Sequence, residues 1–164
     1  MCLPTPWDVT RIVKSTGERP QDFLEFLTPD EISEVSKNDP TWLKCAGKRY
    51  IMALQRGKKG CHFLSRKERR CTIYEARPIL CRLYPFKLLE KRSGKFKGFA
   101  LHNDVGCPRH RDGTVDTEPL HRLYRKDCRH QEDYEVLVRV FNRKRYEGKR
   151  PEDFIDMFYR ESGK

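Results

Sequence analysis

The sequence CHFLSRKERRCTIYEARPILCRLYPF, residues 61–86, carries three cysteines and guides the interpretation of the whole chain. Nine residues separate Cys61 from Cys71, and nine more separate Cys71 from Cys81. Zinc fingers and bacterial ferredoxins place ligands in closer Cys-x2-Cys pairs, so this spacing alone is a weak metal signal. It does not forbid a site, because the entropic cost of closing a loop grows only slowly with loop length.

Positive charge is concentrated around these cysteines. The 164 residues include 35 Lys and Arg against 24 Asp and Glu, a net charge of +11. Residues 48–150 hold 28 of the basic residues, 12 of the acidic residues and five of the seven cysteines: Cys61, Cys71, Cys81, Cys107 and Cys128. Neighbouring cations favour the thiolate, which is the form that binds metal. The coincidence of charge and cysteine therefore indicates a bound metal or an anionic cluster.

Composition and hydropathy exclude several classes of protein. No apolar run approaches the roughly 18–20 residues that a transmembrane helix requires, so we expect no membrane partner. The beginning of the chain holds Asp8, Arg11 and Lys14 without an apolar stretch, which argues against a secretory signal and favours the cytoplasm. An odd number of cysteines in a reducing compartment indicates metal binding or catalysis and not a disulfide scaffold.

Helix-start signals recur in the first quarter of the chain. Thr5-Pro6-Trp7-Asp8 places Pro at the first helical position after an N-cap, and Gly17 is a stop signal, so we predict a helix over residues 6–16. Pro20 begins a second predicted helix that runs to Leu27, and Thr28-Pro29-Asp30-Glu31 repeats the capping pattern for a third. The first quarter is therefore predicted to be helical.

Two hairpins and a helical end are predicted for the rest of the chain. Residues 48–54 and 61–64 flank one turn, although residues 52–54 are equally compatible with a helix, and residues 84–90 and 96–102 flank another. Apolar residues recur at helical spacing from Leu120 to Phe141. Pro151 is predicted to open a last helix with one apolar side, formed by Phe154, Ile155, Phe158 and Tyr159.

These elements predict one α+β domain over residues 1–164. We expect a small, helix-rich fold whose short β-hairpins and loops are organised around a cysteine metal site. Pro78 and Pro85 bracket Cys81 and restrict the residues before them to extended conformations, so its thiol is predicted to lie in a fixed loop.

The pattern Cys-x-Phe-Leu, followed by Cys-x-Ile-Tyr-x-x-Arg-Pro-x-x-Cys-Arg-x-Tyr-Pro-Phe, resembles the YkgJ-type cysteine-cluster family, whose CxxCxxCC domains are described as zinc- or iron-chelating. The resemblance covers about residues 2–108 and leaves residues 117–162 as a helical extension. It implies metal binding by Cys61, Cys71, Cys81 and Cys107. Family members typically begin with a Cys-x2-Cys-x2-Cys-Cys segment before the first helix. Here only Cys2 stands in that place, so the resemblance makes Cys2 a conditional ligand.

Ligand type leaves the identity of the metal open. Four thiolates suit Zn²⁺ and an iron–sulfur cluster equally well. We favour the cluster slightly, because a larger inorganic core bridges cysteines on distant loops more readily and the surrounding cations stabilise its negative charge. Arg77 and Arg82 are candidate hydrogen-bond donors to the sulfur atoms, and His62 and His110 are candidate nitrogen ligands beside Cys61 and Cys107, although surface positions are the simpler interpretation of both histidines.

The two remaining internal cysteines lack a partner motif. Cys45 precedes the first predicted hairpin, and Cys128 lies in a basic helical stretch. An isolated intracellular cysteine usually packs as a small buried apolar residue, so we expect neither to bind metal.

A structural or redox role for the metal centre is the primary hypothesis, and two alternatives stay open. Flagellin lysine methylases are similar in the cysteine region, which suggests a metal-dependent, protein-modifying enzyme, yet no catalytic residue or recognised catalytic motif can be identified. The basic runs at residues 66–70, 143–145 and 149–150 suggest a nucleic-acid-binding accessory protein. The sequence does not favour nucleic-acid binding, because a solvated basic face explains the same charges.

Overall fold

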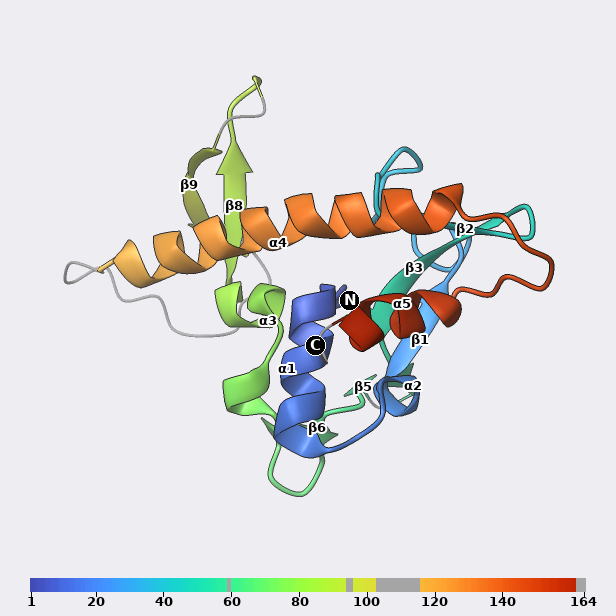
Figure 1. Cartoon of the computed structure of the whole chain (residues 1–164). Coiled ribbons are helices and arrows are strands. Elements are labelled where there is room, and N and C mark those ends of the chain that lie inside the picture. The colour runs from blue at the N-terminus through green and yellow to red at the C-terminus, as the bar shows by residue number, and fades with distance from the viewer. Residues whose placement is uncertain (59, 94–95, 103–115, 162–164) are drawn as a thin grey trace.

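The computed structural model describes residues 1–58, 60–93, 96–102 and 116–161 (Figure 1). Its helices are α1 Pro6–Thr16, α2 Pro20–Phe23, the short 3-10 helix η1 Tyr74–Ala76, α3 Ile79–Leu83, α4 Glu118–Arg143 and α5 Asp153–Glu161. Its strands are β1 Leu24–Leu27, β2 Leu43–Cys45, β3 Lys48–Leu54, β4 Arg56–Gly57, β5 Gly60–Cys61, β6 Leu64–Ser65, β7 Arg70–Cys71, β8 Phe86–Glu90 and β9 Phe96–Leu101.

Helix α1 forms where its capping signals predict it. The Thr5 side chain accepts a hydrogen bond from the Asp8 backbone, and the Asp8 carboxylate accepts one from the Thr5 backbone at 3.0 Å. At the other end Gly17 adopts a left-handed conformation, with φ of 74°, and donates its N–H to the Val13 carbonyl. Both sets of unpaired helix-end groups are therefore satisfied locally.

The second predicted helix is wrong after its first turn. Helix α2 ends at Phe23, and Leu24–Leu27 forms strand β1. This strand pairs antiparallel with β3, which also pairs with β2, so β3 is the central strand. Pro29 disfavours a helical conformation for Thr28, so a helix that starts at Pro20 would be short. Pairing of Leu24–Leu27 with the largely buried β3 outweighs the local helix signals.

The third predicted helix is also wrong. The Thr28 backbone N–H and hydroxyl both donate to the Glu31 carboxylate, at 2.8 and 2.7 Å, as a helix cap would. The chain then continues through turns and bends over residues 32–42. Trp42 and Ile32 pack with Ile51 as a small separate apolar cluster. The capping chemistry therefore forms a turn that no helix follows.

The first predicted hairpin has the wrong partners. Strand β3 pairs with β1 and β2, while residues 61–64 belong to two smaller hairpins, β4–β5 and β6–β7, built from two-residue strands. The second predicted hairpin is confirmed, because β8 and β9 pair antiparallel with Phe86 opposite Leu101. Figure 1 shows this hairpin projecting from the body beside the N-terminal half of α4.

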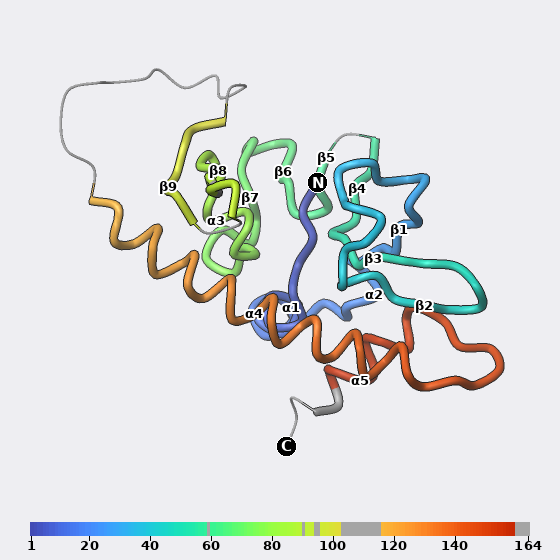
Figure 2. Tube along the Cα trace, turned by 90° about the horizontal axis from the view of Figure 1, so that it is seen from above, coloured from blue at the N-terminus to red at the C-terminus, as the bar shows by residue number. Residues whose placement is uncertain are grey.

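The two ends of the chain share one apolar core with the sheet. Helix α4 lies across the molecule, and α5 packs near α1 and the sheet (Figures 1 and 2). The largest buried cluster includes Val9, Ile12, Phe23, Leu43, Met52, Leu54, Tyr134, Val138, Phe141, Phe154, Ile155 and Phe158. Tyr159 does not join Phe154 on the buried face as predicted, since 42% of its side chain is exposed.

Helices combined with antiparallel strand pairs confirm the α+β class. A search of the described helices for a segment with the length and apolar character of a membrane span finds none.

Candidate metal centre

Four of the five predicted cysteine ligands line one pocket. Cys2, Cys61, Cys71 and Cys81 all face a cavity of about 390 Å³. In Figure 2 the N-terminal segment runs between the hairpins β4–β5 and β6–β7, with α3 close by. Sequence segments that lie far apart in the chain therefore meet at this place.

Helix α3 carries Cys81, so the prediction that this thiol lies in a loop is wrong. Pro78 and Tyr84 flank the helix with extended conformations, so the prolines limit the length of the helix without preventing it. The first amide of the helix, from Ile79, donates to the Asp8 carboxylate at 3.2 Å. Asp8 lies on α1 and is only 2% exposed. Its hydrogen bond to Ile79 therefore fixes the start of the helix that carries Cys81 against α1.

Arg11 adds a second connection between α1 and this segment. Its guanidinium donates to the Asp8 carboxylate at 2.6 Å and to the backbone carbonyl of Arg77 at 2.7 Å. A hydrogen bond between an ionised donor and an ionised acceptor is stronger than a neutral one. The chain between η1 and α3 is thus held to α1 on both sides of Pro78.

The two small hairpins present Cys61 and Cys71. Cys61 lies on β5 opposite Arg56, and Cys71 lies on β7 opposite Leu64. The hairpins are joined by the Phe63 carbonyl, which accepts from the backbone N–H of Thr72 at 2.8 Å. Both cysteines are half-buried and pack against the edge of the main core.

Cys2 reaches the same pocket beside the end of strand β3. Its carbonyl accepts from the Leu54 N–H at 3.0 Å, which aligns the N-terminal segment with the sheet. Its sulfur lies 3.3 Å from the Cys81 sulfur. Two thiolates on one tetrahedral zinc ion are about 3.8 Å apart, given Zn–S bonds of about 2.3 Å, so this pair lies close to a chelating geometry.

The surroundings of the pocket shift the pKa values of its thiols in different directions. The hydrogen bond between Cys2 and Cys81 raises the pKa of Cys2, which burial raises further, and it lowers the pKa of Cys81. The Arg77 charge also lowers the pKa of Cys81. Burial raises the pKa of Cys61, and the Arg56 charge partly opposes that effect. Of the hydrogen-bonded pair, Cys81 is therefore the thiol that loses its proton more readily.

Of the two arginines predicted to donate to the sulfur atoms, Arg77 lines the cysteine pocket and Arg82 does not. Arg77 lines the pocket, and its guanidinium lies 3.6 Å from the centre of the Tyr74 ring. Arg82 is exposed on α3 and is absent from the pocket lining. Arg56 also lines the pocket and was missed, because its position opposite Cys61 depends on a β4–β5 pairing that the sequence did not reveal.

The remaining candidate ligands fall elsewhere. Cys107 and His110 lie outside the described residues. The His62 ring contacts the Glu18 carboxylate at 2.8 Å and does not line the pocket. Cys45 is buried in the main core and Cys128 lies on α4, both away from the pocket lining.

The four thiols are not arranged around one common metal position. Within the part of the chain that the structure describes, no three His, Cys, Asp or Glu side chains are grouped closely enough to hold one metal ion. The close pair, Cys2 and Cys81, is thus accompanied by two thiols on the same pocket at larger separations.

Comparison with protein-family models finds a match over residues 21–108. The matched segment starts in α2, includes Cys61, Cys71, Cys81 and Cys107, and leaves out Cys2 and the two C-terminal helices. Searches of curated proteins and of solved structures found no match. The family match supports a metal-binding role, with zinc or iron as the metal. Since the match covers more than half of the sequence, the chain belongs to the family described as "CxxCxxCC: Putative zinc- or iron-chelating domain".

Proposed function

We propose that Cys2, Cys61, Cys71 and Cys81 are the ligands of a metal centre and that this centre is an iron–sulfur cluster. The observation that carries the proposal is that four thiols from separate segments line one pocket. The matched family is described as zinc- or iron-chelating, which agrees with this ligand chemistry.

The donor set suits the proposed metals. Cysteine thiolates are soft ligands that select zinc, copper(I) and iron–sulfur clusters over magnesium or calcium. Arg56 and Arg77 lie at the same pocket, where they offset the negative charge that several thiolates create. Four cysteines that form no disulfide and lie beside two cations therefore suit a metal centre.

The spacing of the thiols favours a cluster over a single ion. Cys2 and Cys81 are close enough to share one metal atom, yet no third ligand among the described residues joins them. Cys61 and Cys71 line the same pocket from two separate hairpins. A core with several iron atoms bridges ligands on separate segments more readily than one zinc ion does.

Cys107 is proposed as a further ligand. It lies inside the matched family segment, and the family resemblance gives it the same role as Cys81. Its place in this chain follows the β8–β9 hairpin, whose strand β8 begins three residues after α3.

The centre would have a structural role and, if it contains iron, a redox role. It would connect α3, the two small hairpins and the N-terminal segment, whose cysteines all line the pocket. Because metal binding requires the folded arrangement of ligands, the binding free energy adds to the stability of this region.

Anaerobic purification followed by analysis of iron, zinc and acid-labile sulfide tests the proposal. We expect iron with sulfide, a visible absorption band, and loss of most of the metal in Cys71→Ser and Cys81→Ser. Cys128→Ser is the matched control and should retain the metal. Zinc without sulfide would overturn the cluster and retain the ligand set, whereas a folded protein free of metal would overturn both.

A Cys107→Ser variant tests the fifth position separately. Loss of metal comparable to that in Cys71→Ser would support Cys107 as a ligand. Full metal content in that variant would restrict the centre to the four thiols of the pocket.

A further inference from the structure

Exposed apolar side chains gather around the opening of the cysteine pocket. Leu64, Leu80 and Tyr84 line the pocket, and they are 43%, 38% and 61% exposed. Tyr74 is 58% exposed and contacts Arg77, another pocket residue. Clusters of exposed large apolar side chains on soluble proteins often mark binding sites.

The two tyrosine rings are held in place from one side. The Arg77 guanidinium lies over the Tyr74 ring, and the same side chain donates through Nε to the Tyr74 carbonyl at 2.9 Å. The Tyr84 ring stacks on His102, with centroids 5.9 Å apart and planes at 28°. More than half of each tyrosine side chain is nevertheless exposed, so each ring offers a pre-positioned aromatic surface to a flat ligand.

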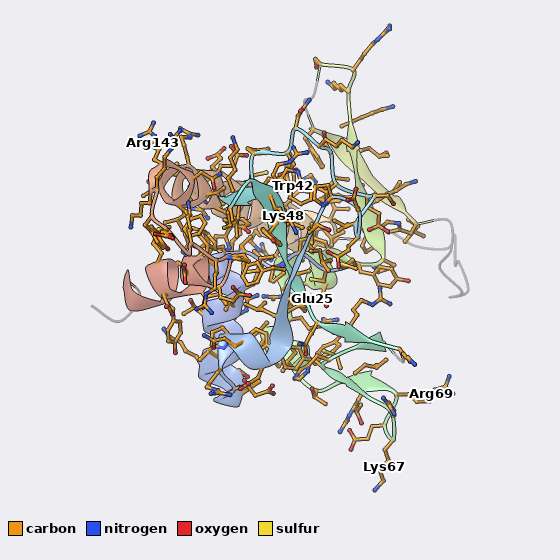
Figure 3. All side chains as sticks on the ribbon, turned by 90° about the vertical axis from the view of Figure 1, so that its right-hand side faces the viewer. Glu25, Trp42, Lys48, Lys67, Arg69 and Arg143 are labelled. Atoms are coloured by element: carbon orange, nitrogen blue, oxygen red, sulfur yellow. The ribbon has the colours of Figure 1, made fainter. Side chains whose placement is uncertain are left out.

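The tip of the β6–β7 hairpin, which extends from the pocket wall at Leu64 and Cys71, carries a dense positive charge. Arg66, Lys67, Arg69 and Arg70 are exposed, and Glu68 is the single acidic residue among them, paired with Arg70 at 2.6 Å. Figure 3 shows Lys67 and Arg69 extending away from the body of the protein.

The charged tip is continuous with the wall of the cysteine pocket, which Tyr84 and Arg77 also line. Leu64 opposite Cys71 and Ser65 opposite Arg70 join the tip directly to the pocket wall. Arg56 on the pocket is exposed as well, which adds positive charge at the rim of its opening.

We propose that this rim binds single-stranded nucleic acid. Phosphates would contact the basic tip, and unpaired bases would stack on Tyr74 and Tyr84, since base–aromatic stacking combined with a basic groove is the usual basis of single-strand recognition. A duplex keeps its base faces covered and would use the charges alone. An acidic peptide would likewise bind the basic side chains through its carboxylates and leave the exposed ring surfaces uncovered. The proposal rests on the rim residues and does not depend on which metal the pocket holds.

Fluorescence anisotropy with a short labelled uridine oligoribonucleotide tests the proposal. We expect Tyr74→Ala and Tyr84→Ala each to weaken binding by about tenfold, the loss of one stacked base. Tyr74→Phe retains an aromatic face and should bind nearly as the parent does. The metal content of each sample is measured in parallel, so that failure of this proposal is distinguished from failure of the metal centre.

Matched charge reversals separate a local surface from the general positive charge of the chain. Lys67→Glu with Arg69→Glu alters the tip, and Arg143→Glu with Lys144→Glu makes the same change at the end of α4, on the opposite side of the view in Figure 3. The tip variant should lose at least tenfold more affinity than the α4 variant and show a shallower salt dependence. Equal losses would overturn the proposal, as would equal affinity for a duplex of the same length or for an acidic peptide of the same charge.

Discussion

The apolar core and the cysteine pocket are held together by different kinds of interaction. In the core, α1, β3, α4 and α5 bury whole side chains, and Phe154, Val138 and Ile12 are fully inaccessible. At the pocket, the strands β4 to β7 are two residues long and their cysteines are only half-buried. Isolated two-stranded hairpins are marginally stable in water. The core is therefore stabilised by extensive apolar burial, whereas the pocket side gains less from burial, mainly through Phe63, Ile73 and Ala76, and has more to gain from a bound metal.

Asp8 connects the two regions. It caps α1, whose Val9 and Ile12 belong to the core, and it accepts from the first amide of α3, which carries Cys81. A change at the pocket should therefore affect stability locally, while a change at Asp8 should affect both sides.

Metal removal should give the largest difference between the two regions. Structural zinc in small domains contributes about 10 kcal/mol or more of apparent binding free energy, and loss of a comparable centre should open the hairpins that it joins. We expect amide hydrogen exchange to accelerate from β4 to α3 after chelation, while β3 and α4 stay protected. Equal exchange in both regions before and after chelation would contradict the comparison.

A core truncation should act in the opposite way. Phe154 is fully buried against Tyr134, Phe141 and Phe158, so Phe154→Ala should cost about 3–5 kcal/mol of unfolding free energy. The loss should be similar with and without metal, as measured by denaturant unfolding. Tyr159→Ala on the exposed side of α5 is the control and should change stability by less than about 1 kcal/mol. A Phe154→Ala effect confined to the metal-bound form would show that the regions are not separate.

Removing the Asp8 carboxylate should weaken both regions by an intermediate amount. Asp8→Ala leaves the Thr5 and Ile79 amides without their acceptor and the Arg11 guanidinium with the Arg77 carbonyl alone, at an expected cost of about 3 kcal/mol. Chelator competition should also show weaker metal retention. Asp22→Ala removes an exposed ion pair with Arg19 and should cost less than about 1 kcal/mol. Unchanged metal retention in Asp8→Ala would separate α1 from the site.

The smallest predicted effect concerns Asp127 on α4 and depends on pH. Burial, reinforced by the Asp8 charge, raises the pKa of Asp127 to about 6. Since the folded state holds this proton more tightly than the unfolded chain, the stabilisation present at low pH is lost as pH rises from about 4 to above 6. Asp127→Asn should therefore raise stability at pH 7 by about 2 kcal/mol and have little effect near pH 4. An equal gain at both pH values would show that the cause is not titration of Asp127.

Local signals predicted the elements that depend on local chemistry. The cap of α1, the β8–β9 hairpin and the long α4 helix all follow from residues close in sequence. The second predicted helix failed because pairing of Leu24–Leu27 with β3 outweighed the capping signals. The third failed although its Thr28–Glu31 cap forms, since a cap by itself does not make a helix follow.

The convergence of the cysteines was predictable only in part. The spacing and the family resemblance pointed to Cys61, Cys71, Cys81 and Cys2, which the structure brings to one pocket. The closeness of Cys2 to Cys81 depends on the Leu54 and Ile79 amides, which no sequence pattern reveals. The role of Arg56 at the pocket likewise follows from strand pairing and not from its neighbours in sequence.

X-ray absorption at the metal edge of the anaerobically purified protein tests the central claim most directly. We predict a first shell made of sulfur, at about 2.3 Å if the metal is zinc, with metal–metal scattering if the centre is a cluster, and loss of this signal in Cys81→Ser but not in Cys128→Ser. A first shell of oxygen or nitrogen, or an unchanged sulfur shell in Cys81→Ser, would contradict the account.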